Sequence, residues 1–352
     1  MHRSFVRYLP VLGLAAAVVI VQRVLSSVGL EYWLIQLTMA AYTTLAAVGL
    51  SLLMGYAGQV SMGHAGFVAI GGYASAVLTT LNLLPFAATP FVRLLTRLGL
   101  SLKGMDIYGA AFLHISPWIA FAAAIVIAAA VALLIGVPVL RLRGHYLAMA
   151  TLAFGFIVQR VLLGTNALGS ADGIADVPAF GLFAGLTLSG KKVFRVQNYY
   201  IAWTLVTLGV LLIVNLMGSR SGRALRALHG NEEAAAASGV NVARFKLAAF
   251  VASALYAAVA GVCMVHFNGG IGPGETSIMK SVRYVALVAA GGMGNVWGTV
   301  CVSSLLTFLS LRGAFGLYDD AVFGAILVAV MLFSPNGLFS FRMGKWRQMR
   351  AR

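Results

Sequence analysis

Two polar side chains, Gln59 and His64, stand in the apolar, glycine-rich stretch GYAGQVSMGHAGFVAIGGYASAVL at residues 55–78. In such surroundings an amide or imidazole group without a hydrogen-bond partner costs free energy, so each should face a partner or a water-filled cavity. The chemistry open to these groups is recognition of a passing polar solute. We therefore interpret Gln59 and His64 as candidate residues of a pathway through the protein.

The same stretch also allows a plainer interpretation, which is close packing of helices. Its small residues recur at intervals of four, at Ala57, Ser61, Ala65 and Ala69. On a helix, this spacing gives one face that another backbone can approach closely. Both interpretations stay open at this point.

Catalysis by this chain is not indicated. The sequence has no Ser/His/Asp constellation, no convincing pair of carboxylates and no His/Cys cluster with metal-ligand spacing. The stretch GLTLSGKK approaches a phosphate-binding loop, but Lys192 stands where a magnesium-binding hydroxyl is required. We therefore expect a chain that is not an enzyme and binds no cofactor or metal itself, and whose work is to move a solute across a bilayer.

The composition is that of a membrane protein. Of the 352 residues, 61% are hydrophobic and only 10% are charged. The net charge of +16 comes from short Lys and Arg clusters between apolar runs rather than from one basic face. The expected electrostatic partner is therefore anionic membrane lipid and not nucleic acid.

Apolar runs predict the fold class. The runs long enough to cross a hydrocarbon core of about 30 Å are 6–25, 31–54, 117–140, 199–217 and 244–267. Weaker runs, each interrupted by Gly, Ser, Thr, His or Arg, are 60–80, 144–163, 279–293, 296–312 and 318–333. The prediction is an all-α polytopic membrane protein, a single domain over residues 1–352 with about ten transmembrane or partly re-entrant helices.

Basic residues predict the orientation, because cytoplasmic loops carry an excess of Lys and Arg. The clusters expected inside are Arg3 with Arg7, Arg141 with Arg143, the loop 219–246, and the C-terminal RMGKWRQMRAR. Both termini are then cytoplasmic, and the two long loops 81–116 and 164–198 are extracytoplasmic. The second of these is rich in Gly, Asn and Asp, which predicts turns. Each loop is interpreted as a lid, a docking surface or a spacer.

Two features at the ends of predicted helices remain. The glycine-rich GGMGNVWG at 291–298 separates two short apolar runs and predicts a broken helix or hairpin, with a simple cytoplasmic turn as the alternative. The basic residues near span ends, including Lys280 and Arg283, are expected to snorkel to the membrane interface, and we assign them no chemistry.

The polar segment SRSGRALRALHGNEEAAAASGVNVARFK, residues 219–246, lies between two apolar runs and favours a helix. Its Leu225, Leu228 and alanines offer a small apolar surface, which Arg223 and Arg226 flank. Gly239 allows a sharp exit from a helix. Such a segment is suited to docking onto another protein in water.

Within this segment, Glu233-Ala234-Ala235-x-x-x-Gly239 resembles the EAA signature of ABC importer permeases. Three longer stretches, with GGMGNVWG, resemble the branched-chain amino-acid ABC transporter permease family, specifically its LivM-like subunit. They are GLSLLMGYAGQVSMGHAGFVAIGGYASAVL, LRLRGHYLAMATLAFGFIVQRVL followed by NALGSADGI, and GRALRALHGNEEAAAASGVNVARFKLAAFVASALYAAVAGV. The Ile-x-Leu-Pro that follows a general EAA run is absent here.

The resemblance implies a mechanical role for residues 219–243, which we name the coupling loop. On that basis the loop docks on an ATP-binding subunit. The residues implied in this ATPase coupling are Arg223, Arg226, Glu232, Glu233, Ala234, Ala235 and Gly239. The implied partners are a second, LivH-like permease subunit, two cytoplasmic ATP-binding subunits that hold ATP and magnesium, and a periplasmic substrate-binding protein. The implied location is the bacterial inner membrane.

The resemblance also implies the substrates leucine, isoleucine and valine. A small zwitterion favours scattered hydroxyls and apolar walls, so the candidates for the substrate pathway are Gln59, Ser61, His64, Thr151 and Asn166. Related permeases carry urea, amides or aromatic acids, and these remain alternatives. An ion-coupled secondary transporter and a membrane scaffold without transport are more distant ones.

Overall fold

The computed structural model describes residues 2–86, 89–97, 101–105, 111–142, 144–182 and 185–333. Of the predicted cytoplasmic clusters, Arg143, the side chain of Arg3 and the C-terminal RMGKWRQMRAR lie outside this description, as does part of the loop 81–116.

A helix lies at each of the ten predicted apolar runs. These helices are α1 (His2–Ser27), α2 (Trp33–Ser51), α3 (His64–Thr80), α5 (Pro117–Val139), α6 (His145–Gly164), α7 (Arg195–Gly218), α10 (Val242–Asn268), α11 (Ile278–Gly291), α12 (Val296–Leu311) and α13 (Asp319–Phe333). Within the described ranges, seven helices are long and apolar enough to cross a membrane. The shorter α3, α11 and α12 have 17, 14 and 16 residues. The chain is a helical, multi-pass membrane protein.

The polar connections carry the remaining elements. The short helices are α4 (Pro90–Arg97), α8 (Arg220–Gly230) and α9 (Glu232–Ala237), and 3-10 turns are η2 (Leu84–Phe86), η3 (Asn166–Leu168), η5 (Lys192–Phe194), η6 (Pro273–Thr276) and η7 (Gly316–Tyr318). Two small antiparallel sheets pair β1 (Ser101–Met105) with β2 (Ala111–Ile115) and β3 (Phe180–Gly181) with β4 (Thr187–Leu188). These short strands lie in the loops outside the long helices, and the fold agrees with the expected all-α polytopic membrane protein.

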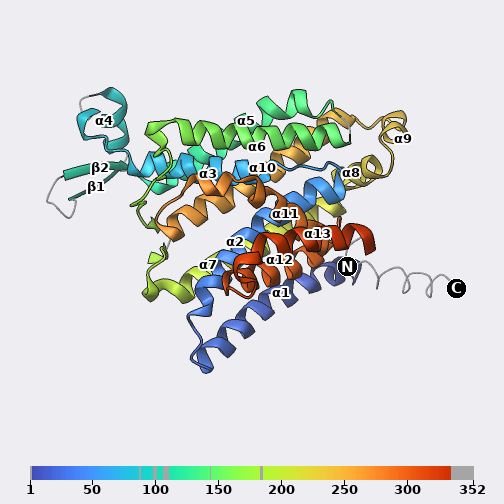
Figure 1. Ribbon diagram of the computed structural model, residues 1–352, viewed down its shortest axis with the longest axis horizontal. Helices are drawn as coiled ribbons and strands as arrows, with labels where there is room; N and C mark the ends of the chain where they lie inside the picture. Colours follow the sequence, from blue (N-terminus) through green and yellow to red (C-terminus); the bar gives the residue numbers. More distant parts are fainter. Residues whose placement is uncertain are drawn as a thin grey trace.

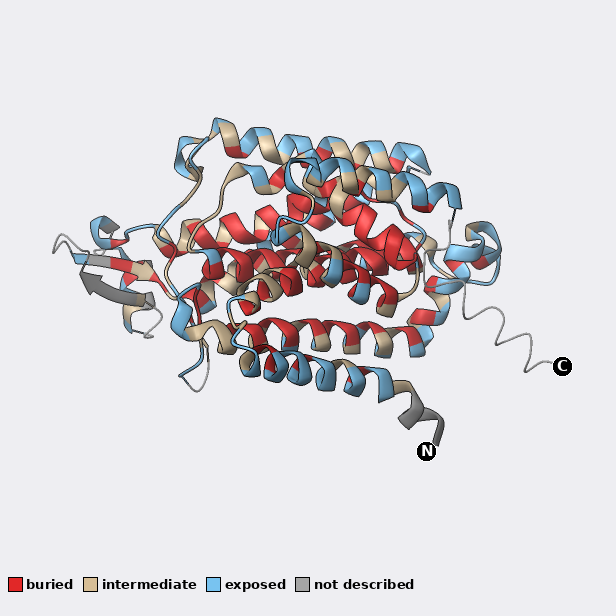
Figure 2. Cartoon of the chain, turned by 60° about the horizontal axis from the view of Figure 1, so that its bottom comes forward, coloured by how far each residue is buried: buried red, intermediate tan, exposed pale blue. Residues whose placement is uncertain are grey.

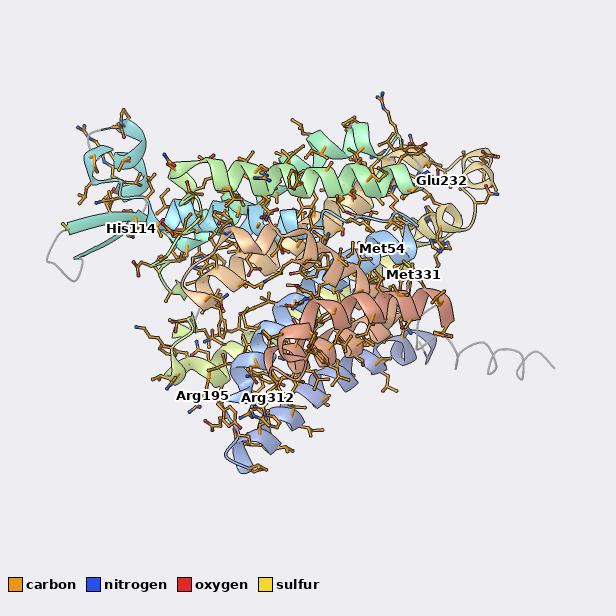
Figure 3. All side chains as sticks on the ribbon, viewed as in Figure 1. Met54, His114, Arg195, Glu232, Arg312 and Met331 are labelled. Atoms are coloured by element: carbon orange, nitrogen blue, oxygen red, sulfur yellow. The ribbon has the colours of Figure 1, made fainter. Side chains whose placement is uncertain are left out.

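The coupling loop and the larger sheet lie at opposite ends of the bundle. Figure 1 shows α8 and α9 at one end and β1, β2 and α4 at the other. In Figure 3, Glu232 and Met54 lie at the first end, whereas His114 and Arg195 lie away from it. The long helices run between these ends.

The most buried helices are α2, α3, α10 and α11, and Figure 2 shows buried residues concentrated in the middle of the bundle. The pair α3 and α10 touches backbone to backbone, because a Cβ at Gly71 would lie 2.4 Å from the Ala258 carbonyl oxygen and one at Gly261 would lie 1.9 Å from that of Val68. Only glycine allows helices to pack so closely.

Helix α5 joins this core through a stripe of small residues that the sequence reasoning did not identify. Its buried positions recur every four residues and are Ala120, Ala124, Ala128, Ala132 and Gly136. A Cβ at Gly136 would lie 2.8 Å from Cδ1 of Leu247 on α10. The stripe lets a strongly apolar helix pack against the core while its other face meets lipid.

The predicted helix face from Ala57 to Ala69 is wrong. Helix α2 continues as a π-helical turn, η1 (Leu52–Tyr56), and the chain then leaves helical geometry until α3 begins at His64. Gly58 has φ +68, a left-handed conformation that an α-helix cannot contain. Ala57 and Ser61 therefore lie in an irregular segment, residues 57–63, which we name the helix break.

Candidate functional site

The coupling loop is built from α8 and α9, with a side-chain cap at the start of each. The Ser219 hydroxyl accepts a hydrogen bond from the backbone N–H of Gly222, 3.3 Å away. Asn231 Oδ1 accepts hydrogen bonds from the N–H groups of Glu233 and Ala234, at 2.9 and 3.0 Å. Such caps satisfy donors that a helix start leaves free, so the loop is ordered rather than a flexible linker.

The exit from the loop is equally defined. Gly239 follows α9 with φ +82, and its N–H donates to the carbonyl of Ala236 at 2.9 Å. Asn241 Oδ1 then accepts from the N–H of Arg244 at 3.1 Å and starts α10. A left-handed glycine after a helix is a common way to end it, which agrees with the predicted sharp exit.

The loop turns its apolar side toward its own bundle. Leu225, Leu228 and Ala235 are buried. The prediction that Leu225, Leu228 and the alanines together offer a docking surface is therefore wrong for these three, which this chain itself covers; Leu225 belongs to the main hydrophobic core. Arg223 and Ala234 are exposed.

Charged contacts fasten both ends of the loop. Lys246 in α10 forms an ion pair with Glu232, and the Lys246 side chain is only 7% exposed. Arg226 Nη2 donates a hydrogen bond to the carbonyl of Met217 at 3.0 Å. Of the predicted coupling residues, Glu232 and Arg226 thus bond to this chain through their side chains, and Glu233 and Gly239 are exposed on the loop.

The coupling loop touches the helix break. A Cβ at Gly58 would lie 2.9 Å from Nδ1 of His229, the histidine near the end of α8. On the other side of the break, a Cβ at Gly55 would lie 2.0 Å from the backbone nitrogen of Gly294. The backbone of residues 55–58 is therefore held between the coupling loop and the turn that joins α11 to α12.

That second turn is the predicted hairpin. Helix α11 ends at Gly291, Gly292 and Gly294 have φ +102 and +82, and α12 begins at Val296. Asn295 caps α12 by accepting from the N–H of Gly298 at 3.3 Å. The glycines allow the tight reversal and the close approach of the helix break.

Four of the five predicted pathway residues gather at the helix break. Gln59, Ser61, His64 and Thr151 are each at most 2% exposed. Thr151 Oγ1 accepts a hydrogen bond from the Met62 N–H at 2.9 Å, and His64 Nε2 lies 3.1 Å from the carbonyl oxygen of Ala46. The break therefore joins α2 and α3 to the first half of α6.

Two of these side chains keep unused hydrogen-bonding capacity. Among the described residues, neither the amide oxygen nor the amide nitrogen of Gln59 has a partner, and the Ser61 hydroxyl has none either. Buried polar groups are rarely left so, and each such atom calls for water, an ion or a ligand. This observation favours the pathway interpretation of the break over plain packing.

Asn166 does not join this group. It lies in η3 beyond the end of α6, is exposed, and accepts a hydrogen bond from the Ser170 hydroxyl at 3.0 Å. At a rise of about 1.5 Å per residue, the rest of α6 separates Asn166 from Thr151 by roughly 20 Å. The polarity of Asn166 suggested a pathway residue, but polarity alone does not show that a residue lies beyond the end of a helix.

A multi-pass helical bundle with unsatisfied polar groups inside it, and an ordered polar loop packed against them, is the arrangement expected of a membrane permease. Residues 32–332 match the family described as "Branched-chain amino acid transport system / permease component". The chain belongs to this family, which confirms the expected resemblance.

Individual relatives agree with this assignment. The chain is 31% identical over 321 residues to the high-affinity branched-chain amino acid transport system permease protein LivM of Salmonella typhimurium, covering 86% of this chain and 68% of the relative. It is 24% identical over 315 residues to LivH of Escherichia coli, covering 86% and 92%. The xylose transport system permease protein XylH of Haemophilus influenzae is 29% identical over 197 residues, covering 51% and 49%. No solved structure matches the chain.

Proposed function

We propose that this chain is one permease subunit of an ATP-driven importer in the bacterial inner membrane, and that the importer moves leucine, isoleucine and valine into the cytoplasm. The observation that carries this proposal is the family match over residues 32–332, supported by relatives named as branched-chain amino acid permeases. Because the LivM and LivH relatives both align along most of this chain, the partner permease is a LivH-like subunit of similar fold.

The proposed topology has ten crossings and both termini in the cytoplasm. It places α8, α9 and the α11–α12 turn inside, and the two sheets outside, in agreement with their positions at opposite ends of the bundle. The loops 81–116 and 164–198 then face the periplasm, where a substrate-binding protein delivers the amino acid. ATP and magnesium are held by two cytoplasmic partner subunits.

The coupling loop transmits the work of these ATP-binding subunits to the helix break. Movement of α8 presses on Gly58 through His229, and the same segment carries Gln59 and Ser61. A push from the cytoplasm therefore reaches the polar groups in the bundle through a single layer of contacts. This path connects ATP hydrolysis elsewhere to the opening of a passage here.

Variants of the exposed part of the loop test the docking step. Glu233→Lys reverses a charge in the first turn of α9, where the helix dipole favours an acid, and Gly239→Pro cannot adopt the observed φ of +82. In the assembled importer, the double variant should keep ATP hydrolysis but lose most uptake. Unchanged uptake by a correctly inserted double variant would remove the loop from the mechanism.

Reconstitution tests the function as a whole. The chain, its partner permease, both ATP-binding subunits and the binding protein are placed in vesicles, and uptake of radiolabelled leucine is followed. We expect uptake that requires ATP and is competed by isoleucine and valine. Uptake that persists without the ATP-binding subunits and collapses with an ionophore would instead indicate a secondary carrier. If the importer instead takes up urea, amides, aromatic acids or xylose in preference to leucine, the proposed substrate is wrong.

A further inference from the structure

A second polar group lies at the end of the bundle opposite the coupling loop. Glu275 in η6 and Lys280 in the first turn of α11 form an ion pair with 2.8 Å between Oε1 and Nζ. The Glu275 and Lys280 side chains are 26% and 37% exposed. The sequence contains no signal for this pairing of Lys280.

A cavity lies on each side of this ion pair. The larger one, of about 170 Å³, is lined by Glu275 and by the aliphatic side chains of Val68, Val265 and Ile271. The smaller one, of about 70 Å³, is lined by Lys280 and Thr307, among others. Met264 lines both, so the cavities are neighbours that share a flexible wall.

Both cavities contain hydrogen-bonding atoms without partners. Among the described residues, Glu275 Oε2 and Thr307 Oγ1 are buried and make no hydrogen bond. The hydroxyl of Tyr73, which packs in a cluster with Ile271, has no partner either. The Lys280 ammonium has three N–H donors and forms one bond with Glu275. An acid and a base thus stand side by side, each able to bind something more.

Arg283, one turn further along α11, supports the wall of the smaller cavity. Its Nη2 donates to Asp319 Oδ2 at 2.5 Å and to Asp320 Oδ1 at 2.9 Å, which ties α11 to the start of α13. Its guanidinium also lies 4.5 Å from the ring centroid of Phe323. Arg283 Nε has no partner among the described residues, so Arg283 also keeps a donor beside the smaller cavity, and Lys280 is the cation next to Glu275.

We propose that the two cavities form a binding site for an α-amino acid zwitterion with an aliphatic side chain. The ammonium binds Glu275 Oε2, the carboxylate binds Lys280 and the Thr307 hydroxyl, and the side chain lies against Val68, Val265 and Ile271. The ligand is neutral overall and so is the ion pair, so no net charge is brought into the bundle. This site rests on the proposed function and gives the imported solute a place at the outer end of its path.

Photo-crosslinking tests the site directly. The assembled importer in lipid nanodiscs, without ATP, is irradiated with a diazirine analogue of leucine, and the labelled peptides are identified by mass spectrometry. We expect label on the segments containing Met264, Val265 and Ile271, with at least a tenfold loss in excess leucine. Glu275→Gln should reduce this label at least tenfold. Label unchanged by Glu275→Gln would overturn the proposal.

A reversed pair separates binding from a structural role. The double variant Glu275→Lys/Lys280→Glu keeps an ion pair but exchanges the two positions, so copurification of all subunits and basal ATP hydrolysis should be retained while the label is lost. Retained label would show that the pair only holds η6 to α11. Glu31→Gln is the matched control, because Glu31 pairs with Arg195 at 3.2 Å and is similarly exposed, at 37%. It should keep the label.

Charge recognition is tested by competition. In the wild-type complex, leucine should suppress the label, whereas 3-methylbutylamine and 4-methylpentanoate, which each lack one charged group, should compete at least tenfold more weakly. Equal competition by either compound would contradict a zwitterion site. If the wild-type importer takes up no leucine at all, the proposed function fails; if it takes up leucine but the label ignores Glu275, only the site fails.

Discussion

The ion pair between Glu232 and Lys246 holds the base of the coupling loop. Lys246 is almost completely buried, whereas the Glu232 side chain is 33% exposed. When a buried ammonium loses its partner, its desolvation still costs free energy and nothing offsets that cost. Breaking an exposed ion pair changes the stability only slightly. The contribution of this pair to stability therefore comes mainly from the burial of Lys246. Its loss should show how strongly the loop is attached to α10.

Glu232→Gln should lower the free energy of unfolding by about 1–3 kcal/mol, less than for a fully buried pair because Glu232 is partly exposed. Denaturant titration of the protein in detergent micelles measures the change. As a control, Glu31→Gln breaks a more exposed pair and should cost about 1 kcal/mol or less. Equal effects of the two variants would show that Lys246 is solvated.

Helices in this protein are held by close backbone contact at glycine and alanine as well as by burial of large side chains. Lipid tails are as apolar as the helices, so the hydrophobic effect does not drive helices together in a membrane. Close van der Waals packing stabilises their association instead. Gly71 and Gly261 make such contacts between α3 and α10. Both helices line the larger cavity, so their spacing also determines whether a ligand fits there.

Gly261→Ala should force α3 and α10 apart, because the new Cβ would lie 1.9 Å from the backbone oxygen of Val68. We expect a loss of about 1–3 kcal/mol of stability, or a lower yield of folded protein. Gly13→Ala is the matched control, since a Cβ at Gly13 meets nothing within 4 Å. Monodispersity in size-exclusion chromatography and denaturant titration measure both. Equal stability of the two variants would contradict this packing.

For the molecule as a whole, the order of its helices was predictable from the sequence. Backbone in a bilayer must satisfy its own hydrogen bonds, so each apolar run has little choice but a helix. The helix break was not predicted, because the small residues continue through it from Ala57 to Ala69 and hide the left-handed Gly58. The alanine run at residues 234–237 favours a helix, and α9 forms there. Which side of α9 faces the bundle depends on contacts with distant segments, which the local sequence does not reveal.

The candidate site was predictable only in part. Gln59, Ser61 and His64 lie close in space because they are close in sequence. Asn166 lies far from them because most of α6 separates it from Thr151. The contact of Arg283 with Asp319 joins residues 36 apart, and it exists only because α13 returns along α11. The cavities beside Glu275 depend on such returns, and the sequence contains no signal for them.

Sidedness can be tested on the intact membrane. In a background without Cys263 and Cys301, Leu317→Cys lies in η7, fully exposed at the outer end in the proposed topology, and Ala236→Cys lies in α9 at the inner end. A membrane-impermeant maleimide should label Leu317→Cys in spheroplasts and should label Ala236→Cys only after permeabilisation. Reversed accessibility would invert the orientation.

Gly58→Ala is the variant that tests whether the coupling loop acts on the helix break. ATP hydrolysis and leucine uptake are measured together in the reconstituted importer. Gly29→Ala is the matched control, because Gly29 has a similar φ of +75 but meets nothing within 4 Å. In both variants an alanine must adopt a left-handed conformation, which costs about 1–2 kcal/mol of stability. Only the Gly58→Ala methyl group also contacts His229.

We predict that Gly58→Ala hydrolyses ATP at close to the wild-type rate but imports at least tenfold less leucine per ATP. Because α8 acts on Gly58 through His229, His229→Ala should also lower this ratio, whereas Gly29→Ala should keep the wild-type ratio. An unchanged ratio of leucine imported to ATP hydrolysed in Gly58→Ala would show that the coupling loop does not act on the helix break.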